Sequence, residues 1–134
     1  MEDCIFCKII KNEIPCDHIY DDENFLAFLD IRPVNKGHVL IVPREHHTNL
    51  LDMPPELLEK YLPVIQKIAK ATVKAVKADG CNVSINNGAA SGQVIFHTHF
   101  HIIPRFENDG LKVWPRNEET FNFKEVGESI KKLL

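Results

Sequence analysis

Residues 97–103 constrain the fold of this chain more strongly than any other stretch. Their sequence, His-Thr-His-Phe-His-Ile-Ile, places three of the chain's seven histidines at alternating positions. An extended strand points successive side chains to opposite faces, so His97, His99 and His101 would share one face. The other face would be mostly apolar, which predicts a half-buried strand whose wet face carries three imidazoles. A surface strand with scattered histidines is the simpler alternative, and the strict alternation disfavours it.

Hydrophobic periodicity predicts four further strands, one long helix and a short helix at each end. The strands cover residues 18–21, 25–29, 38–43 and 81–86; the long helix covers 55–78, and the terminal helices cover 4–11 and 123–134. The strand at 38–43 is nearly all apolar, as is typical of a central strand covered on both faces. Pro63 lies inside the helical pattern and should kink the long helix or mark its true start.

Bulk properties exclude several classes of protein. The 134 residues fit one domain, and the net charge of −3 argues against a nucleic acid polymer as partner. No apolar run is long enough for a membrane span, and the first residues lack the apolar core of a signal peptide. Four cysteines at this length do not form the pattern of a secreted disulfide scaffold, so we expect a cytoplasmic protein.

The histidine strand and the loop before it favour phosphoryl or nucleotidyl transfer. Residues 87–93 are small and contain glycine, so backbone N–H groups could approach an anion closely. Imidazoles can donate hydrogen bonds to a phosphate, and an imidazole can also attack phosphorus directly. If the strand at 81–86 lies in the same sheet, Asn86 faces the same cleft as the histidines. Acyl transfer is less suitable, because Ser91 is not on the sharp strand-to-helix turn that a nucleophilic serine needs.

Several ordered motifs resemble those of the histidine triad (HIT) family, whose signature is His-φ-His-φ-His-φ-φ with φ apolar. Thr98 departs from that signature but suits a strand. The resemblance extends from residue 4 to 105, and the tail 106–134 lies outside it. Besides the triad it includes Cys-Ile-Phe-Cys-Lys-Ile-Ile at 4–10, Phe-Leu-Asp-Ile at 28–31, Gly-His-Val-Leu-Ile-Val-Pro at 37–43, His-x-x-Asn at 46–49, Asn-Asn-Gly at 86–88 and Gly-Gln at 92–93.

The resemblance implies an α+β fold, with an antiparallel sheet of about five strands, one long helix and short terminal helices, in a single HIT domain over 1–134. It also implies a homodimer whose two sheets join into one continuous larger sheet. The implied activity is hydrolysis or transfer at the α-phosphate of purine nucleotide conjugates, with adenosine the expected nucleoside. Nucleoside phosphoramidates and dinucleoside polyphosphates are the two substrate types. A nucleotide-binding scaffold dimer without useful turnover is the alternative.

The resemblance also implies a role for each site residue. His99 would be the nucleophile that carries a covalent nucleotidyl group, His101 would hydrogen-bond the phosphate, and His38 would support the reacting histidine. Val94 stands where some relatives have serine or threonine, so one hydroxyl contact to phosphate is missing. The nucleotide-binding residues would be Asp30, Ile31, Asn86, Gly92, Gln93, Val94, His99 and His101.

The pair Cys4-x-x-Cys7 is ambiguous by itself. A redox pair would need a preceding strand, and two thiols without any metal are a further alternative. Resemblance to zinc-containing HIT proteins implies a structural Zn²⁺ site. The ligands would be Cys4, Cys7, His46 and His97, with His47 as the competitor for His46.

Overall fold

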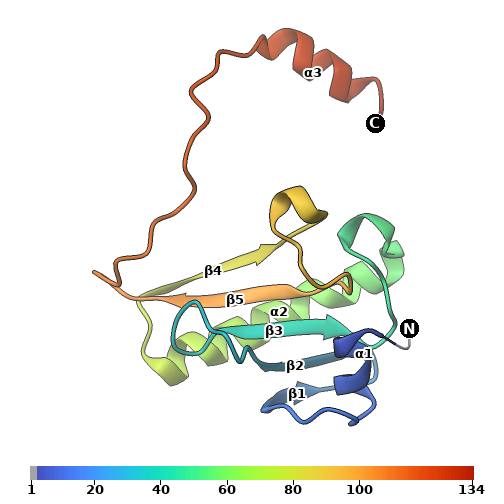
Figure 1. Cartoon of the computed structure of the whole chain (residues 1–134). Helices are drawn as coiled ribbons and strands as arrows, with labels where there is room; N and C mark the ends of the chain where they lie inside the picture. The colour runs from blue at the N-terminus through green and yellow to red at the C-terminus, as the bar shows by residue number, and fades with distance from the viewer. Residues whose placement is uncertain (1–2) are drawn as a thin grey trace.

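A five-stranded antiparallel sheet is the frame of the molecule in the computed structural model, which describes residues 3–134. The strand order is β1-β2-β3-β5-β4, with a long helix, α2, across one face (Figure 1). The strands are β1 (His18–Asp21), β2 (Phe25–Leu29), β3 (Val39–Pro43), β4 (Gly80–Ile85) and β5 (Phe100–Arg105). The predicted antiparallel α+β architecture is therefore confirmed.

The strand β3 lies in the middle of the sheet, as its apolar sequence predicts. All five of its residues are buried, and it pairs with β2 on one side and with β5 on the other. Its pairing with β5 places Leu40 opposite His101. Because β3 and β5 are direct neighbours, His38 just before β3 can reach the histidine on β5.

The helix α2 (Pro55–Val76) begins at the predicted residue and is unbroken by Pro63, so Pro63 does not mark its start. Pro63 lies on the exposed side of the helix. There the carbonyl of Glu59, which loses its intrahelical partner, can be hydrated by solvent. The apolar side of α2 packs on the sheet in a core that includes Phe25, Ile41, Tyr61 and Ile102.

A second apolar core covers part of the opposite face of the sheet. The short helix α1 (Ile5–Ile10) contributes Phe6 and Ile9, which pack against Leu26, Phe28, Leu40 and Val42. The order of layers is therefore α2, sheet, α1. Since α1 covers the end of the sheet at which β5 begins, residues 97–99 are buried and not in solvent.

The prediction that all three triad histidines line the wet face of one strand is wrong in two respects. β5 begins only at Phe100, so His97 and Thr98 precede the strand. His97 and His99 are 0% and 7% exposed, because the aromatic ring of Phe6 lies against both imidazoles. The alternation correctly predicted a shared side, but it could not reveal the helix that covers it.

The chain after β5 ends in α3 (Phe123–Lys131), within the predicted range 123–134. It stands apart from the sheet and α2 (Figure 1). Two single-turn 3-10 helices, Leu50–Asp52 and Ala89–Ser91, complete the regular structure. Among residues 3–134, no helix combines the length and the apolar character that a membrane crossing requires.

Candidate active site and metal site

Two hydrogen bonds to backbone carbonyls fix the tautomers of His97 and His99. His97 donates from Nε2 to the carbonyl oxygen of Pro43 at 2.8 Å, and His99 donates from Nδ1 to the carbonyl oxygen of His97 at 2.7 Å. A neutral imidazole carries one proton, so each ring has a lone pair on its other nitrogen. These lone pairs are at Nδ1 of His97 and at Nε2 of His99.

Two hydrogen bonds in series give His101 the opposite tautomer to His99, with its proton on Nε2. The backbone N–H of Val34 donates to Nδ1 of His38 at 3.0 Å, so the proton of His38 is on Nε2. Nε2 of His38 lies 2.9 Å from Nδ1 of His101 and donates to it. The proton of His101 is therefore on Nε2, which is buried without a hydrogen-bond partner in the described residues. The ring of His101 thus offers an unused N–H donor.

The lone pair of His99 and the N–H donor of His101 lie in neighbouring rings. The two ring centroids are 4.9 Å apart, in an edge-to-face arrangement. Burial lowers the pKa of His99, lowers the pKa of His38, and lowers the pKa of His101 to about 4. All three imidazoles are therefore neutral at neutral pH, which leaves Nε2 of His99 free to attack an electrophile.

The four residues expected to bind metal lie together at the buried end of the sheet. Their ligand atoms are all within 4.8 Å of one another, and they are Cys4, Cys7, His46 and His97. Nδ1 of His97 lies 3.4 Å from Sγ of Cys4 and 3.5 Å from Sγ of Cys7, and Nδ1 of His46 lies 3.4 Å from Sγ of Cys7. His47 is not in this group; instead its carbonyl oxygen accepts hydrogen bonds from Thr98.

This donor set fits Zn²⁺. Tetrahedral zinc with Zn–S bonds of about 2.3 Å and Zn–N bonds of about 2.0 Å separates a sulfur from a nitrogen by about 3.5 Å. The sulfur–nitrogen distances quoted above agree with that value. Hydrogen bonding of His97 Nε2 to Pro43 also leaves Nδ1, the nitrogen nearest the thiols, free to bind a cation.

The loop between β4 and β5 is held in place by Gln93. Its side-chain Oε1 accepts from the backbone N–H of Gly88 at 2.8 Å, and its Nε2 donates to the carbonyl oxygens of Thr48 and Ile95 at 2.7 and 3.1 Å. Gln93 is buried and both of its amide protons are engaged, so its side chain has no free donor for a phosphate. The structure therefore places Gln93 behind the loop, while Val94 is exposed.

Other expected nucleotide-binding residues border the triad from two sides. Asp30 lies 3.7 Å from Nε2 of His38 and accepts from the backbone N–H of Arg32, and Ile31 is exposed. On the β4 side, Asn86 donates to the carbonyl oxygen of Gly92 at 3.5 Å. Ser84 pairs with His101 in the sheet, so β4 forms the second border.

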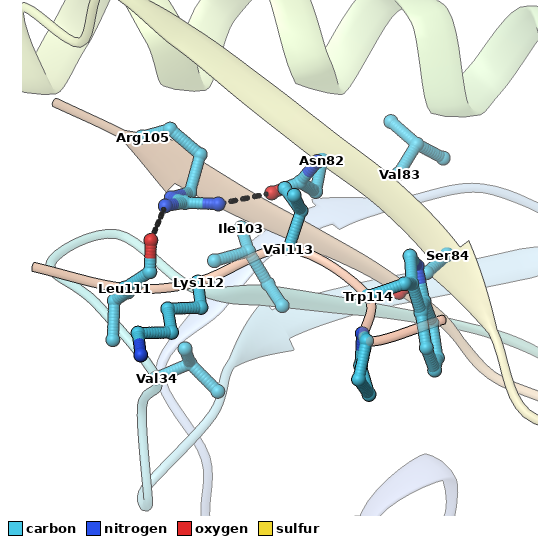
Figure 2. Close-up of a pocket in the computed structure, with 11 residues that line it drawn as sticks. Val34, Asn82, Val83, Ser84, Ile103, Arg105, Leu111, Lys112, Val113 and Trp114 are labelled. Carbon is cyan, nitrogen blue, oxygen red and sulfur yellow. Dashed lines mark hydrogen bonds between the residues drawn. The ribbon is translucent and has the colours of Figure 1, made fainter. Parts of the chain in front are cut away.

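A hollow of about 340 Å³ lies along β4 and β5 (Figure 2). Ile103, which lines it, is two residues from His101 on β5, so both side chains face the same side of the sheet. Apolar side chains of Val34, Ile103 and Trp114 contribute to its walls, beside Ser84. Neither Trp114 nor Phe6 is among the site residues expected from the sequence. Trp114 lies in the tail beyond the motifs, and only the packing of α1 shows that Phe6 covers the histidines.

Comparison with protein families and curated proteins gives consistent matches. The family model described as the HIT domain matches residues 11–108. The adenylylsulfatase HINT3 of Arabidopsis thaliana is 49% identical over 81% of this chain and 55% of that longer protein. The adenosine 5′-monophosphoramidase HNT1 of Saccharomyces cerevisiae is 44% identical over 98% of this chain and 80% of that protein.

Solved structures match the same fold. SMU.412c from Streptococcus mutans superposes with a TM-score of 0.90 at 41% identity, covering 99% of this chain and 84% of that chain. A HIT family protein from Bacillus subtilis also gives 0.90 at 41% identity, covering 98% and 97%. A zinc-bound histidine triad protein from Mycobacterium smegmatis gives 0.79 at 42% identity, covering 88% and 85%.

Proposed function

Because this chain belongs to the HIT family, we propose that it cleaves purine nucleotide conjugates at the α-phosphate through a covalent nucleotidyl-histidine intermediate. The observation that carries the proposal is that hydrogen bonds fix complementary tautomers in two neighbouring imidazoles, His99 and His101. Nε2 of His99 has a lone pair, and the ring beside it, His101, offers an N–H that has no partner among residues 3–134. Attack on phosphorus needs a lone pair at the nucleophile and a donor for the phosphoryl oxygen.

In the first step, Nε2 of His99 attacks the α-phosphorus. A phosphorus–nitrogen bond forms, the bond from phosphorus to the leaving group breaks, and the leaving group departs with that electron pair and takes up a proton. The His99 ring becomes cationic, and its Nδ1–H still donates to the carbonyl oxygen of His97. That charge-assisted hydrogen bond stabilises the intermediate, while Nε2–H of His101 donates to a phosphoryl oxygen.

In the second step, water attacks the same phosphorus. The bond from phosphorus to Nε2 of His99 breaks, and its electron pair returns to Nε2, which restores the neutral ring. The nucleoside monophosphate leaves, and the proton of the attacking water passes to solvent. His38 acts here as a positioning residue. Its hydrogen bond to His101, ordered by the backbone of Val34, keeps the proton of His101 on Nε2, the nitrogen without another partner among residues 3–134.

We assign nucleoside binding to the border formed by Asp30 and Ile31, with Asp30 accepting from ribose hydroxyls. The second border, Asn86 together with Gly92 and the backbone N–H of Val94, would hold the phosphate. Gln93 supports this loop from behind, because its amide groups are engaged with Thr48, Gly88 and Ile95. Exposed Val94 has no hydroxyl, so the leaving group must obtain its proton elsewhere.

Zinc, held by Cys4, Cys7, His46 and His97, would have a structural role. Four protein ligands complete a tetrahedral site and leave no position for substrate or water. The ion would fix the N-terminal segment beside the triad. The four cysteines form no disulfide in the described residues, which supports the proposal that the protein works in the cytoplasm.

Two relatives suggest which bonds to test first. One is an adenosine 5′-monophosphoramidase, which favours a phosphorus–nitrogen bond, and the other is an adenylylsulfatase. The test uses purified protein with adenosine phosphoramidate, adenylyl sulfate and a dinucleoside polyphosphate. We expect His99→Ala to lower turnover by at least about 10³-fold, because the nucleophile is lost.

His18→Ala is the matched control, since His18 is an exposed histidine on β1. It should leave turnover unchanged, and both variants should keep the circular dichroism spectrum of the wild type. Rapid quenching followed by intact-mass analysis should detect a nucleotidyl adduct on the wild type and none on His99→Ala. Normal turnover by His99→Ala would exclude His99 as the nucleophile. Tight nucleotide binding without turnover of any substrate would favour the scaffold alternative.

We also propose that the chain forms a homodimer whose two sheets join into one, and that its single HIT domain carries an additional C-terminal segment. The sheet supports this proposal because it ends at a regular strand. β4 pairs with β5 over six consecutive residues and has no neighbour on its other side in the described chain. The opposite edge, β1, has four residues with an irregular register, which is a poorer template for pairing.

A further inference from the structure

Two of the contacts that hold the ring of His99 come from residues in or beside the Cys/His cluster. The carbonyl oxygen of His97 accepts the Nδ1–H of His99 at 2.7 Å, and the ring of Phe6 lies edge-on to the His99 ring, with the centroids 5.1 Å apart. His97 is a member of the cluster, and Phe6 lies in the chain between two other members, Cys4 and Cys7. The position of the proposed nucleophile therefore depends on residues that the cluster holds.

The position of the His97 carbonyl depends on the His97 side chain. β5 begins only at Phe100, so His97 precedes the paired part of the strand. The ring of His97 is completely buried and is held at both nitrogens. Nε2 donates to the carbonyl oxygen of Pro43, and Nδ1 lies 3.4 and 3.5 Å from the two thiols of the cluster. A metal ion bound by Nδ1 and these thiols would fix the ring whose backbone carbonyl orients His99.

The next residue, Thr98, is anchored beside the cluster as well. Its backbone N–H and its hydroxyl both donate to the carbonyl oxygen of His47, at 2.7 and 3.0 Å. His47 follows the cluster member His46, whose Nδ1 lies 3.4 Å from Sγ of Cys7. Both residues that directly precede His99 are therefore held at the cluster or next to it.

Phe6 depends on the cluster through α1. This helix has only six residues, and so short a helix is not stable in water by itself. Sγ of Cys4 caps it by accepting from the backbone N–H of Cys7 at 3.4 Å, so a metal ion bound to both thiols would close its first turn. α1 lies against the sheet where β3 ends (Figure 1), and from there Phe6 covers the rings of His97 and His99.

The main core of the domain does not depend on the cluster. It lies on the α2 side of the sheet, around residues such as Ile41, Tyr61 and Ile102, and it contains none of the four candidate ligands. Without a metal ion, the sheet and α2 should therefore remain folded, while His97 and Phe6 gain freedom to move. A displacement of about 1 Å at a reacting group can cost about 10²-fold in rate. Loss of the metal should thus disturb the geometry of His99 more than the fold.

From these observations we infer that metal occupancy of the Cys/His cluster sets the tautomer and the direction of the His99 lone pair, with His97 and Phe6 as the positioning residues. The ion would touch neither the substrate nor the reacting atoms. Its loss should therefore lower kcat and leave KM nearly unchanged. The inference rests on the proposed function in one respect, because it takes His99 as the nucleophile. It gives the cluster a role in catalysis in addition to holding the N-terminal segment.

His46→Gln is the test variant, because it removes a ligand that comes from a different segment than the triad. His47→Gln is the matched control, since the ring of His47 lies outside the cluster and its backbone carbonyl is retained. After loading with Zn²⁺ and dialysis, elemental analysis should find the metal only in the control. Nuclear magnetic resonance of ¹⁵N-labelled histidine should show His99 protonated at Nδ1 in the control and a mixture of tautomers in His46→Gln. We expect kcat of His46→Gln to fall by about tenfold or more, with KM within about twofold of the wild type.

Phe6→Leu tests the contact from α1 in a protein that keeps its metal. Ile9→Val is its matched control, because it removes apolar volume from the same helix and the same core. Phe6→Leu should retain zinc and lower kcat by about tenfold without a change in KM, because the ring that covers His99 is lost. Ile9→Val should retain zinc and leave both kinetic constants unchanged.

Circular dichroism should show that all four variants are folded. The inference is overturned if metal-free His46→Gln, or wild type stripped by a chelator, keeps the His99 tautomer and the kcat of the loaded wild type. It is also overturned if metal loss raises KM alone, if it unfolds the whole domain, or if Phe6→Leu behaves like Ile9→Val. If loaded wild type turns over no nucleotide, the proposed function fails, and the nitrogen spectra still decide whether the metal orients His99.

Discussion

The proton on His101 is positioned by groups that lie far from it in the sequence. The backbone N–H of Val34 sets the tautomer of His38, and His38 sets that of His101. Since Nε2 of His101 has no other partner in the described residues, its donor is available to a ligand. The proposed chemistry at His99 therefore depends on two hydrogen bonds in series, the first of which is donated by the backbone amide of Val34.

We predict that nuclear magnetic resonance of ¹⁵N-labelled histidine will show His101 protonated at Nε2 and not at Nδ1 at pH 7. Its ring should remain neutral until the pH approaches about 4, because burial lowers its pKa to that value. His38→Gln should scramble the tautomer of His101, since the donor that orders it changes. A spectrum in which His101 is mainly protonated at Nδ1 would contradict the proposed order of protons.

Burial of the His101 ring also predicts how the free energy of unfolding depends on pH. The pKa of His101 is about 4 in the folded protein, against 6.5 for the ordinary side chain, so the unfolded chain binds more protons between these values. The free energy of unfolding should therefore fall as the pH is lowered from about 6.5 towards 4 and be fully retained above that window. His38, whose pKa burial also lowers, adds to the fall.

Urea unfolding at pH 7 and pH 5 measures this effect. The fall for the wild type should exceed that for His101→Gln by about 1–2 kcal/mol, after allowance for partial solvent exposure of the ring. Any metal lost at pH 5 affects both proteins, so the difference isolates His101. Equal falls in the two proteins would show that the His101 ring is not desolvated on folding.

At the scale of elements, the turn before β3 fixes the distance between the sheet and the end of α2. Gly37 has a φ of +84°, and a Cβ there would lie 2.9 Å from Cγ1 of Val76 and 3.2 Å from Cγ of Pro104. Only glycine combines this backbone conformation with so close an approach. The turn leads directly into His38, so the packing of α2 and the position of that imidazole are coupled.

We predict that Gly37→Ala lowers the free energy of unfolding by about 2–4 kcal/mol, through backbone strain and overpacking together. Gly110→Ala is the matched control. Gly110 has a similar φ of +75° but nothing within 4 Å of the added Cβ, so it should show the backbone cost alone. Chemical denaturation of the two variants and the wild type measures both costs. An equal loss in both variants would mean that the contact with Val76 is readily relieved.

At the scale of the whole molecule, the Cys/His cluster that could hold a metal ion brings together three separate parts of the chain. Cys4 and Cys7 come from the first helix and its N-cap, His46 follows β3, and His97 precedes β5. A bound ion would therefore tie the N-terminal segment to both central strands, next to the triad. A site that binds only the folded chain adds its binding free energy to the stability of the fold.

We predict that the purified protein contains about one zinc ion per chain, and that a chelator lowers its melting temperature by about 5 °C or more. Cys7→Ser should lose the metal and melt like the chelated wild type. Cys16→Ser, at a half-buried thiol outside the cluster, should keep both metal and melting temperature. Elemental analysis and calorimetry on the same samples test this. Metal-free wild type that is unaffected by the chelator would exclude a zinc site.

Much of the architecture was predictable from local patterns. The bounds of β1 and β2 agree with the predicted residues, and α2 starts at the predicted Pro55, because turn residues and apolar periodicity are properties of short segments. The start of β5 was predicted three residues too early. There the alternation continues through His97 and His99, but their rings donate to the backbone carbonyls of Pro43 and His97, and the backbone N–H of Thr98 donates to His47 instead of to a strand.

By itself, the sequence determined which side chains this protein has for chemistry and the order in which they occur: alternating imidazoles, a thiol pair, a small glycine-bearing loop and a central apolar strand. Only the tertiary structure decided which nitrogen of each imidazole carries the proton, which rings are buried and which side chains join the thiols. The carbonyls of Pro43 and His97 and the amide of Val34 choose the tautomers, Phe6 buries the rings, and His46 rather than His47 joins the thiols. Backbone donors and acceptors are the same in every residue, so the sequence carries no local mark of them. They gain their roles only when folding brings distant segments together.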